Sequence, residues 1–151
     1  MRRSEKEITD QSVIEEIIHG ALVCRLALSE SDQPHIVPLC FGYQDYTLYF
    51  HSASEGKKVD IIKKNPNVCF EFDINTEIVK AEKACQWGMR YKSIIGFGRA
   101  VIVENIKEKE KAISIIMNQY SNEQFQFDED AIRETTVIKV DIDSMSGKES
   151  G

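Results

Sequence analysis

The sequence predicts a mainly β domain with flanking helices, an α+β fold in which six antiparallel strands form a small barrel. Apolar, β-rich runs recur along the chain and are separated by short polar turns, which is typical of an antiparallel meander. Amphipathic segments lie before, between and after these runs. The 151 residues, 42% of them hydrophobic, suffice for a single domain over residues 1–151, and a sheet closed on itself would hide its edges.

The expected strands are bounded by turn residues. Glu30–Pro34 and Gln44–Asp45 have the composition of turns. Pro38 cannot donate to a ladder and therefore marks an edge or a bulge. Gly96 and Gly98, inside one long run, indicate a bend, a bulge or the close approach of another group. The six strands are predicted at residues 21–29, 35–43, 46–52, 68–74, 91–103 and 136–142.

Helices are expected at residues 9–19, 57–64 and 106–120, where apolar side chains recur at helical spacing. Asp10 or Ser12 can cap the first helix, and Gly20 ends it. The polar segment 121–134 is expected to be a loop with a short helical turn. Residues 77–87 give no clear assignment, and residues 144–151 are predicted to be a flexible tail.

Charge and composition narrow the possible functions. A formal net charge of −6 with few basic clusters argues against nucleic-acid binding. No apolar run approaches the roughly 20 residues of a membrane helix, and the charged N-terminus lacks the apolar core of a signal peptide, so a cytoplasmic location is expected.

The histidines are 16 residues apart and no Cys-x-x-Cys pair occurs, so no metal site is predicted. The four cysteines are expected to be unpaired thiols.

The segment from His51 to Lys58 has the order of an anion site. A strand-like run ends in Ser52, and Gly56, Lys57 and Lys58 then begin a helix. Loop donors, the positive end of a helix and lysine charge together suit a phosphate on a small molecule. The alternative is an ordinary capped helix start with exposed lysines.

Two further segments could contact a ligand. Around Pro38, a strand that has left its partner would offer amides and carbonyls to a flat polar ligand; an edge strand with a tolerated proline is the simpler explanation. In the segment 87–100, Arg90 and Lys92 could reach a phosphate and Trp87 could cover a planar group. The alternative is a strand with an aromatic lead-in.

These segments together resemble the flavin-binding split-barrel family related to pyridoxamine 5′-phosphate oxidase, and within it the 5-nitroimidazole resistance (Nim-type) proteins. The resemblance covers nearly the whole chain. It is carried by His35-Ile36-Val37-Pro38-Leu39, Leu48-Tyr49-Phe50-His51-Ser52-Ala53 with Gly56-Lys57-Lys58, Asn65-Pro66-Asn67-Val68, and Tyr91-Lys92-Ser93-Ile94-Ile95-Gly96-Phe97-Gly98-Arg99-Ala100.

The resemblance implies a split barrel that forms a homodimer with two flavin sites at the subunit interface. FMN is the usual cofactor, and FAD is the alternative. Lysine stands at positions 57 and 92, where many relatives carry arginine, so the bidentate fork is lost. The implied cofactor-binding residues are Val37, Pro38 and Leu39 along the ring, Phe50, His51 and Ser52 along the ribityl chain, Lys57 and Lys58 at the phosphate, and Arg90 to Ser93, partly from the second subunit.

The implied activity is that of a flavin-dependent oxidoreductase. NADH or NADPH would reduce the flavin, and the electrons would pass to a small acceptor such as a nitroaromatic. His51 is the candidate for protonating the acceptor, because histidine is the residue type that ordinarily exchanges a proton near neutral pH. A histidine hydrogen-bonded at a strand end is the plainer interpretation. A non-catalytic protein that binds flavin, haem or deazaflavin is the alternative function, and a structural dimer with an empty cleft is a third.

Overall fold

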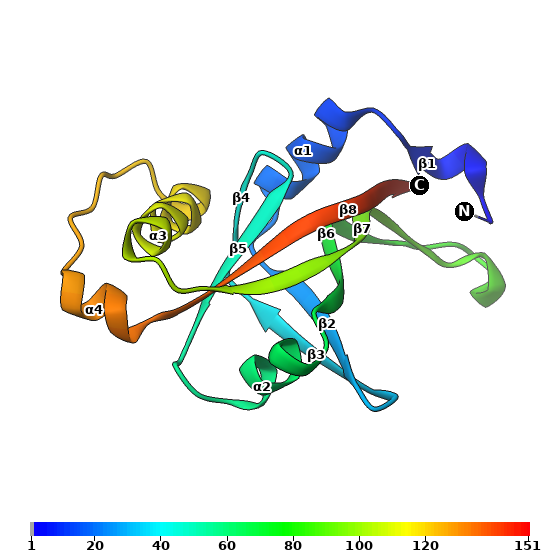
Figure 1. The fold of residues 1–151 in the computed structure, drawn as a ribbon. Coiled ribbons are helices and arrows are strands. Elements are labelled where there is room, and N and C mark those ends of the chain that lie inside the picture. The colour runs from blue at the N-terminus through cyan, green and yellow to red at the C-terminus, as the bar shows by residue number, and fades with distance from the viewer. Residues whose placement is uncertain (1) are drawn as a thin grey trace.

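The computed structural model describes residues 2–151 as one antiparallel sheet with helices around it (Figure 1). Helices α3 and α4 gather on one side of the sheet, and the two chain ends lie on the other. The strands are β1 (Glu7–Ile8), β2 (Cys24–Glu30), β3 (Gln33–Leu39), β4 (Gly42–Gln44), β5 (Thr47–Ser52), β6 (Asn67–Val79), β7 (Gly88–Val103) and β8 (Thr136–Ser150). The helices are α1 (Gln11–Gly20), α2 (Lys57–Lys64), α3 (Ile106–Tyr120) and α4 (Glu129–Glu134), with 3-10 turns η1 (Ser4–Lys6) and η2 (Ala84–Gln86).

The sheet has eight strands rather than the predicted six. Its order is β3-β2-β6-β7-β8-β5-β4, and β1 adds to β8. Within residues 2–151 no ladder joins the end strands β3 and β4, so the sheet is open, whereas the sequence predicted a closed one. The predicted strand 35–43 is divided into β3 and β4, because the chain leaves the ladder at Cys40 and Phe41.

The prediction of a flexible tail is wrong. Residues 144–150 belong to β8 and pair with β7 from Phe97 to Tyr91. A further ladder joins Gly147 and Lys148 of β8 to β1. Main-chain hydrogen bonds carry this pairing, so the polar side chains that suggested a tail are compatible with a strand.

The helices agree closely with the prediction. Helix α1 starts after Asp10, whose carboxylate accepts a hydrogen bond of 2.9 Å from the Ser12 amide. This contact selects Asp10 over Ser12 as the cap. Helices α2 and α3 have the predicted bounds, and α4 is the expected short turn in the polar segment.

The main apolar core lies between the sheet and the helices, and a smaller cluster of Val103, Ala112 and Val137 lies where α3 packs on the sheet. Ile14, Ile17 and Ile18 of α1 are buried in the main core together with large side chains of the sheet. The Phe70 ring occupies the space where a side chain at Gly96 would stand, and Gly98 lies at a register shift between β7 and β8. Close approach and a bulge, both predicted for these glycines, are therefore confirmed. All four cysteines are free.

Candidate functional site

The sheet has an opening between β3 and β5, which do not pair with each other. The β4–β5 ladder ends at the pair Gly42 and Tyr49. Beyond that pair, β3 runs along β2, and β5 continues along β8 as far as Ser52. The edge of β3 that faces away from β2 and the last residues of β5 therefore have no ladder partner on their second side within residues 2–151.

Two predicted segments lie on these open edges. Leu39 and Ser52 are each three residues from the Gly42–Tyr49 pair. At a strand rise of about 3.3 Å per residue, each lies within roughly 10 Å of that pair. Both segments, Val37–Leu39 and Phe50–Ser52, thus lead away from the same pair, and each has main-chain groups without a ladder partner on one edge.

The side chains of these residues point in different directions. Pro38 is exposed, whereas Val37 and Leu39 are half-buried and pack against the core. Phe50 is fully buried in the core, so only its main chain is available to a ligand. His51 is exposed and Ser52 is half-buried. Among these residues, His51 therefore offers the most accessible ionisable group.

The N-terminus of α2 follows after a four-residue loop. The helix begins at Lys57, after the cap residue Gly56, whose φ is 149°, and no side chain caps its first turn. Lys57 is exposed and Lys58 is half-buried. Open first-turn amides, the positive helix end and two ammonium groups form a site for an anion. The carboxylate of Asp60 in the same turn opposes part of this positive charge.

Arg90 and Ser93 are not brought to this place by the same chain. The end of α2 is tied to β7 by the Ala100 amide, which donates to the Pro66 carbonyl at 2.8 Å. Ten residues of strand separate Arg90 from Ala100, which corresponds to roughly 33 Å, and Ser93 is roughly 23 Å away. Arg90 instead contacts Glu77 at 3.4 Å on the projecting β6–β7 hairpin.

Ser93 lines a different depression, on the outer face of the sheet. This depression has a volume of about 390 Å³. Arg25 contacts Asp73 at 2.8 Å and Glu71 at 3.3 Å at its margin. Burial, followed by a hydrogen bond with Asp73, raises the pKa of Glu71. The lining residues are Glu71, Asp73, Thr76, Tyr91, Ser93, Ile95 and Lys148.

An apolar patch on this outer face was missed by the sequence analysis. Phe97 is 56% exposed, and it is in register with Cys69, Ala27 and then Ile36, which is 63% exposed. Ile95 and Val101 of β7 are also exposed. The signal was present, because both alternate faces of β7 carry apolar side chains, which is typical of a strand covered on both sides. We call Ile36, Ile95, Phe97 and Val101 the outer patch.

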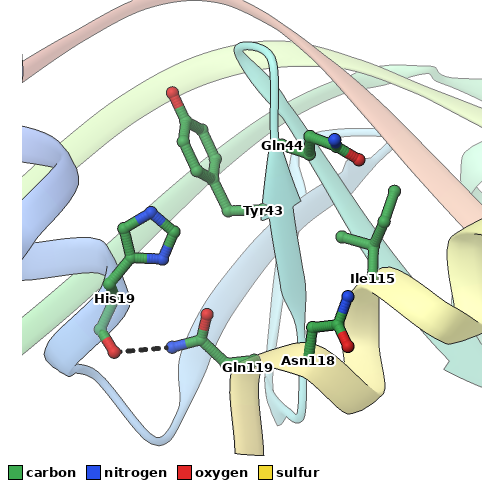
Figure 2. Close-up of a pocket in the computed structure, with 6 residues that line it drawn as sticks. All are labelled: His19, Tyr43, Gln44, Ile115, Asn118 and Gln119. Atoms are coloured by element: carbon green, nitrogen blue, oxygen red, sulfur yellow. Dashed lines mark hydrogen bonds between the residues drawn. The ribbon is translucent and has the colours of Figure 1, made fainter. Parts of the chain in front are cut away.

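A third depression, of about 210 Å³, lies between α1, β4 and α3 (Figure 2). The Tyr43 hydroxyl donates to Glu15 at 2.9 Å, and burial raises the pKa of this phenol. The Gln119 amide lies within hydrogen-bond distance of the carbonyls of Ile18, His19 and Ala21. These contacts join α3 to the end of α1.

Comparison with known proteins identifies the family. Residues 10–149 match the family model described as pyridoxamine 5′-phosphate oxidase. The chain belongs to the pyridoxamine 5′-phosphate oxidase family. Its fold is the split barrel of that family, and the open sheet described above is the form it takes here. No curated protein matches the chain by sequence.

Solved structures agree with membership of the pyridoxamine 5′-phosphate oxidase family. A candidate 5-nitroimidazole antibiotic resistance protein from Bacteroides thetaiotaomicron is 36% identical, with a TM-score of 0.85 over 95% of this chain and 86% of that one. An FAD and haem binding protein from Mycobacterium smegmatis is 16% identical, with a TM-score of 0.86 over 96% and 73%. An FAD-binding protein from Mesorhizobium loti is 22% identical, with a TM-score of 0.72 over 97% and 98%.

The predicted family is thus confirmed. The described part of the chain contains no helix long and apolar enough to cross a membrane.

Proposed function

We propose that the protein is a homodimeric flavoprotein that binds FMN and passes electrons from NADH or NADPH to a small acceptor, similar to the nitroimidazole resistance proteins. The observation that carries the proposal is the uncapped start of α2, with Lys57 and Lys58, directly after the open edge of β5. A location in the cytoplasm remains a prediction of the sequence.

The phosphate end of FMN fits the start of α2. At Gly56 nothing lies within 4 Å of the position a Cβ would take, so the loop leaves room for a phosphate beside the first-turn amides. A phosphate dianion would gain hydrogen bonds from these amides and charge from Lys57 and Lys58. Ser52 and His51 would lie along the chain that joins the phosphate to the ring.

The ring end fits the open edge of β3. The ring carries hydrogen-bond donors and acceptors on one edge, and the main chain of Val37–Leu39 offers both kinds of group. Pro38 has no N–H, so only its carbonyl is offered at that residue. When bound, FMN would supply a ring that accepts a hydride and releases two electrons to an acceptor. His51, exposed at the end of β5, would donate a proton to the acceptor.

A second copy of the chain would complete the site. Arg90 and Ser93 lie too far along β7 to reach α2 of their own chain, as the strand length requires. The outer patch exposes Ile36 on β3 and Ile95 and Phe97 on β7 on one face of the sheet, with β2 and β6 between them. An exposed apolar patch of this kind favours association, and it places Ser93 at the margin of the contact.

The proposal is tested by releasing and identifying the bound molecule. The purified protein is denatured, and the absorption spectrum and mass of what dissociates are measured. A flavin spectrum with the mass of FMN is expected, and the mass of FAD would correct the cofactor. A colourless protein that takes up no added FMN would contradict flavin binding and favour a structural dimer.

Electron transfer is tested separately from binding. Under anaerobic conditions, NADH or NADPH is expected to bleach the flavin absorption, and a nitroimidazole is expected to restore it. A flavin that neither nucleotide reduces would contradict the reductase activity and support a passive flavin carrier.

The second candidate is a non-catalytic protein that binds haem or deazaflavin as well as, or instead of, flavin. It is favoured by the similarity to the FAD and haem binding protein from M. smegmatis, whose fold superposes with a TM-score of 0.86. A Soret band in the purified protein would support haem, and the released mass would reveal a deazaflavin.

A further inference from the structure

Tyr120, the last residue of α3, ties three separate segments together through one hydroxyl group. The hydroxyl accepts a hydrogen bond of 3.0 Å from the Phe41 amide. It donates one of 2.8 Å to the Leu22 carbonyl, between α1 and β2. The end of α3 is thereby fixed to the junction between β3 and β4 and to the segment that leads into β2.

Within residues 2–151, no main-chain carbonyl accepts a hydrogen bond from the Phe41 amide. Phe41 lies between Leu39, the end of β3, and Gly42, the start of β4, where the ladder is interrupted. Its residue is fully buried, so an unpaired amide at this position would be costly. Tyr120 therefore replaces the strand partner that the opening of the sheet removes.

Aromatic packing also holds the Tyr120 side chain in this position. Its ring packs edge-on against Phe41, with the ring centres 6.3 Å apart, and Phe41 packs in the same way against Phe72 at 4.8 Å. Burial raises the pKa of Tyr120 to about 12, so the hydroxyl keeps its proton at working pH and continues to donate to Leu22.

We propose that Tyr120 is a positioning residue for the flavin site. By holding the main chain at Phe41, its hydroxyl sets the angle at which Val37–Leu39 separates from β5, and hence the distance between the two open edges. This inference rests on the proposed function, because those edges are where FMN would bind. In this role Tyr120 acts through the main chain at Phe41.

The neighbouring Gln119 provides a matched control. Its amide contacts the carbonyls of Ile18, His19 and Ala21, so it docks the same end of α3 against α1. Within residues 2–151 it makes no hydrogen bond to Phe41 or to β3. Gln119→Met removes these hydrogen bonds at similar size, whereas Tyr120→Phe removes only the hydroxyl and keeps the ring.

The test measures FMN affinity and amide hydrogen exchange in the parent and in both variants. Tyr120→Phe is expected to weaken FMN binding about tenfold, as the loss of the two hydrogen bonds made by its hydroxyl allows. It is also expected to accelerate exchange at Phe41 in the FMN-free protein. Gln119→Met is expected to change FMN affinity less than about twofold and to leave exchange at Phe41 as in the parent.

The outcomes separate this inference from the proposed function. Parental FMN affinity in Tyr120→Phe, or an equal loss in Gln119→Met, would overturn the positioning role alone. A parent that binds no FMN would overturn both. If Tyr120→Phe does not fold, amide hydrogen exchange in the parent tests the inference instead. FMN is then expected to slow exchange at Val37, Leu39 and Phe41. Unchanged exchange at these amides would overturn the positioning role of Tyr120.

Discussion

At the scale of single residues, the proposed binding of FMN depends most on the two lysines at the start of α2. Lys57→Ala with Lys58→Ala is expected to weaken FMN binding at least about tenfold and to reduce its salt dependence, because two charges next to the phosphate are lost. Isothermal titration with FMN measures the effect. The control removes the same charge from the other end of the helix, by Lys63→Ala with Lys64→Ala. Equal losses in both double variants would place the phosphate elsewhere.

His51 allows a second test at this scale. His51→Gln keeps a polar side chain but cannot deliver a proton at neutral pH, so the rate of acceptor reduction should fall by about 100-fold. Stopped-flow reoxidation of reduced protein by a nitroimidazole measures it. Reduction of the flavin by NADH is the internal comparison and should change far less. Unaltered turnover would remove His51 from the proton-donating role.

Glu71 gives a prediction about pH. Burial and the neighbouring Asp73 raise its pKa in the folded protein, against the pull of Arg25. The folded state therefore binds the proton of Glu71 more tightly than the unfolded chain does. Above the folded pKa, the ionised Glu71 carboxylate destabilises the folded state. This destabilisation is lost as the pH falls below about 4.5, the ordinary pKa of the group. Glu71→Gln should therefore raise the melting temperature at pH 7 more than at pH 4. An equal shift at both pH values would contradict this explanation.

At the scale of elements, β7 depends on a glycine. Gly96→Ala would place a methyl group inside the Phe70 ring, so the free energy of unfolding should fall by about 1–3 kcal/mol. Urea denaturation measures it. Gly88→Ala in the same strand is the control, because nothing lies within 4 Å of its Cβ position, and it should be neutral or slightly stabilising. A stable Gly96→Ala variant would mean that Phe70 can move without cost.

Elements with strong local signals could be predicted from the sequence, and elements without them could not. Helix α2 has its predicted bounds because Gly56 precedes it and Asn65-Pro66 follows it. The break between β3 and β4 was hidden, because residues 39–43 are mostly apolar and resemble a continuous strand. The β8 extension was hidden for the opposite reason, since residues 144–150 bury few side chains and owe their place to the partner strand.

The same distinction applies to the candidate site: parts with a local sequence signal could be predicted, and parts that depend on distant contacts could not. Segments close in sequence, such as His51 and Lys57, could be placed together from their order alone. The roles of Tyr120 and of the outer patch could not, because both depend on contacts between distant parts of the chain. The separation of Arg90 from α2 likewise follows only from the length of β7.

At the scale of the whole molecule, the outer patch predicts association. The parent is expected to have the mass of two chains, and Phe97→Lys the mass of one, because a buried ammonium group would be unpaired in the contact. FMN affinity should fall with it. Light scattering after gel filtration measures the mass. Phe125→Lys, which changes a 40%-exposed ring in the loop between α3 and α4, is the control and should remain dimeric.

The open side of β3 has a consequence for the behaviour of the protein in the cell. An unshielded strand can recruit a strand from another molecule and start uncontrolled polymerisation. Pro38 lacks an N–H group and therefore cannot donate a hydrogen bond to an incoming strand. It would thus oppose strand addition at this edge in the ligand-free protein. Pro38→Val should make newly synthesised chains precipitate, most severely when riboflavin is scarce, and the soluble yield with and without added vitamin would reveal it.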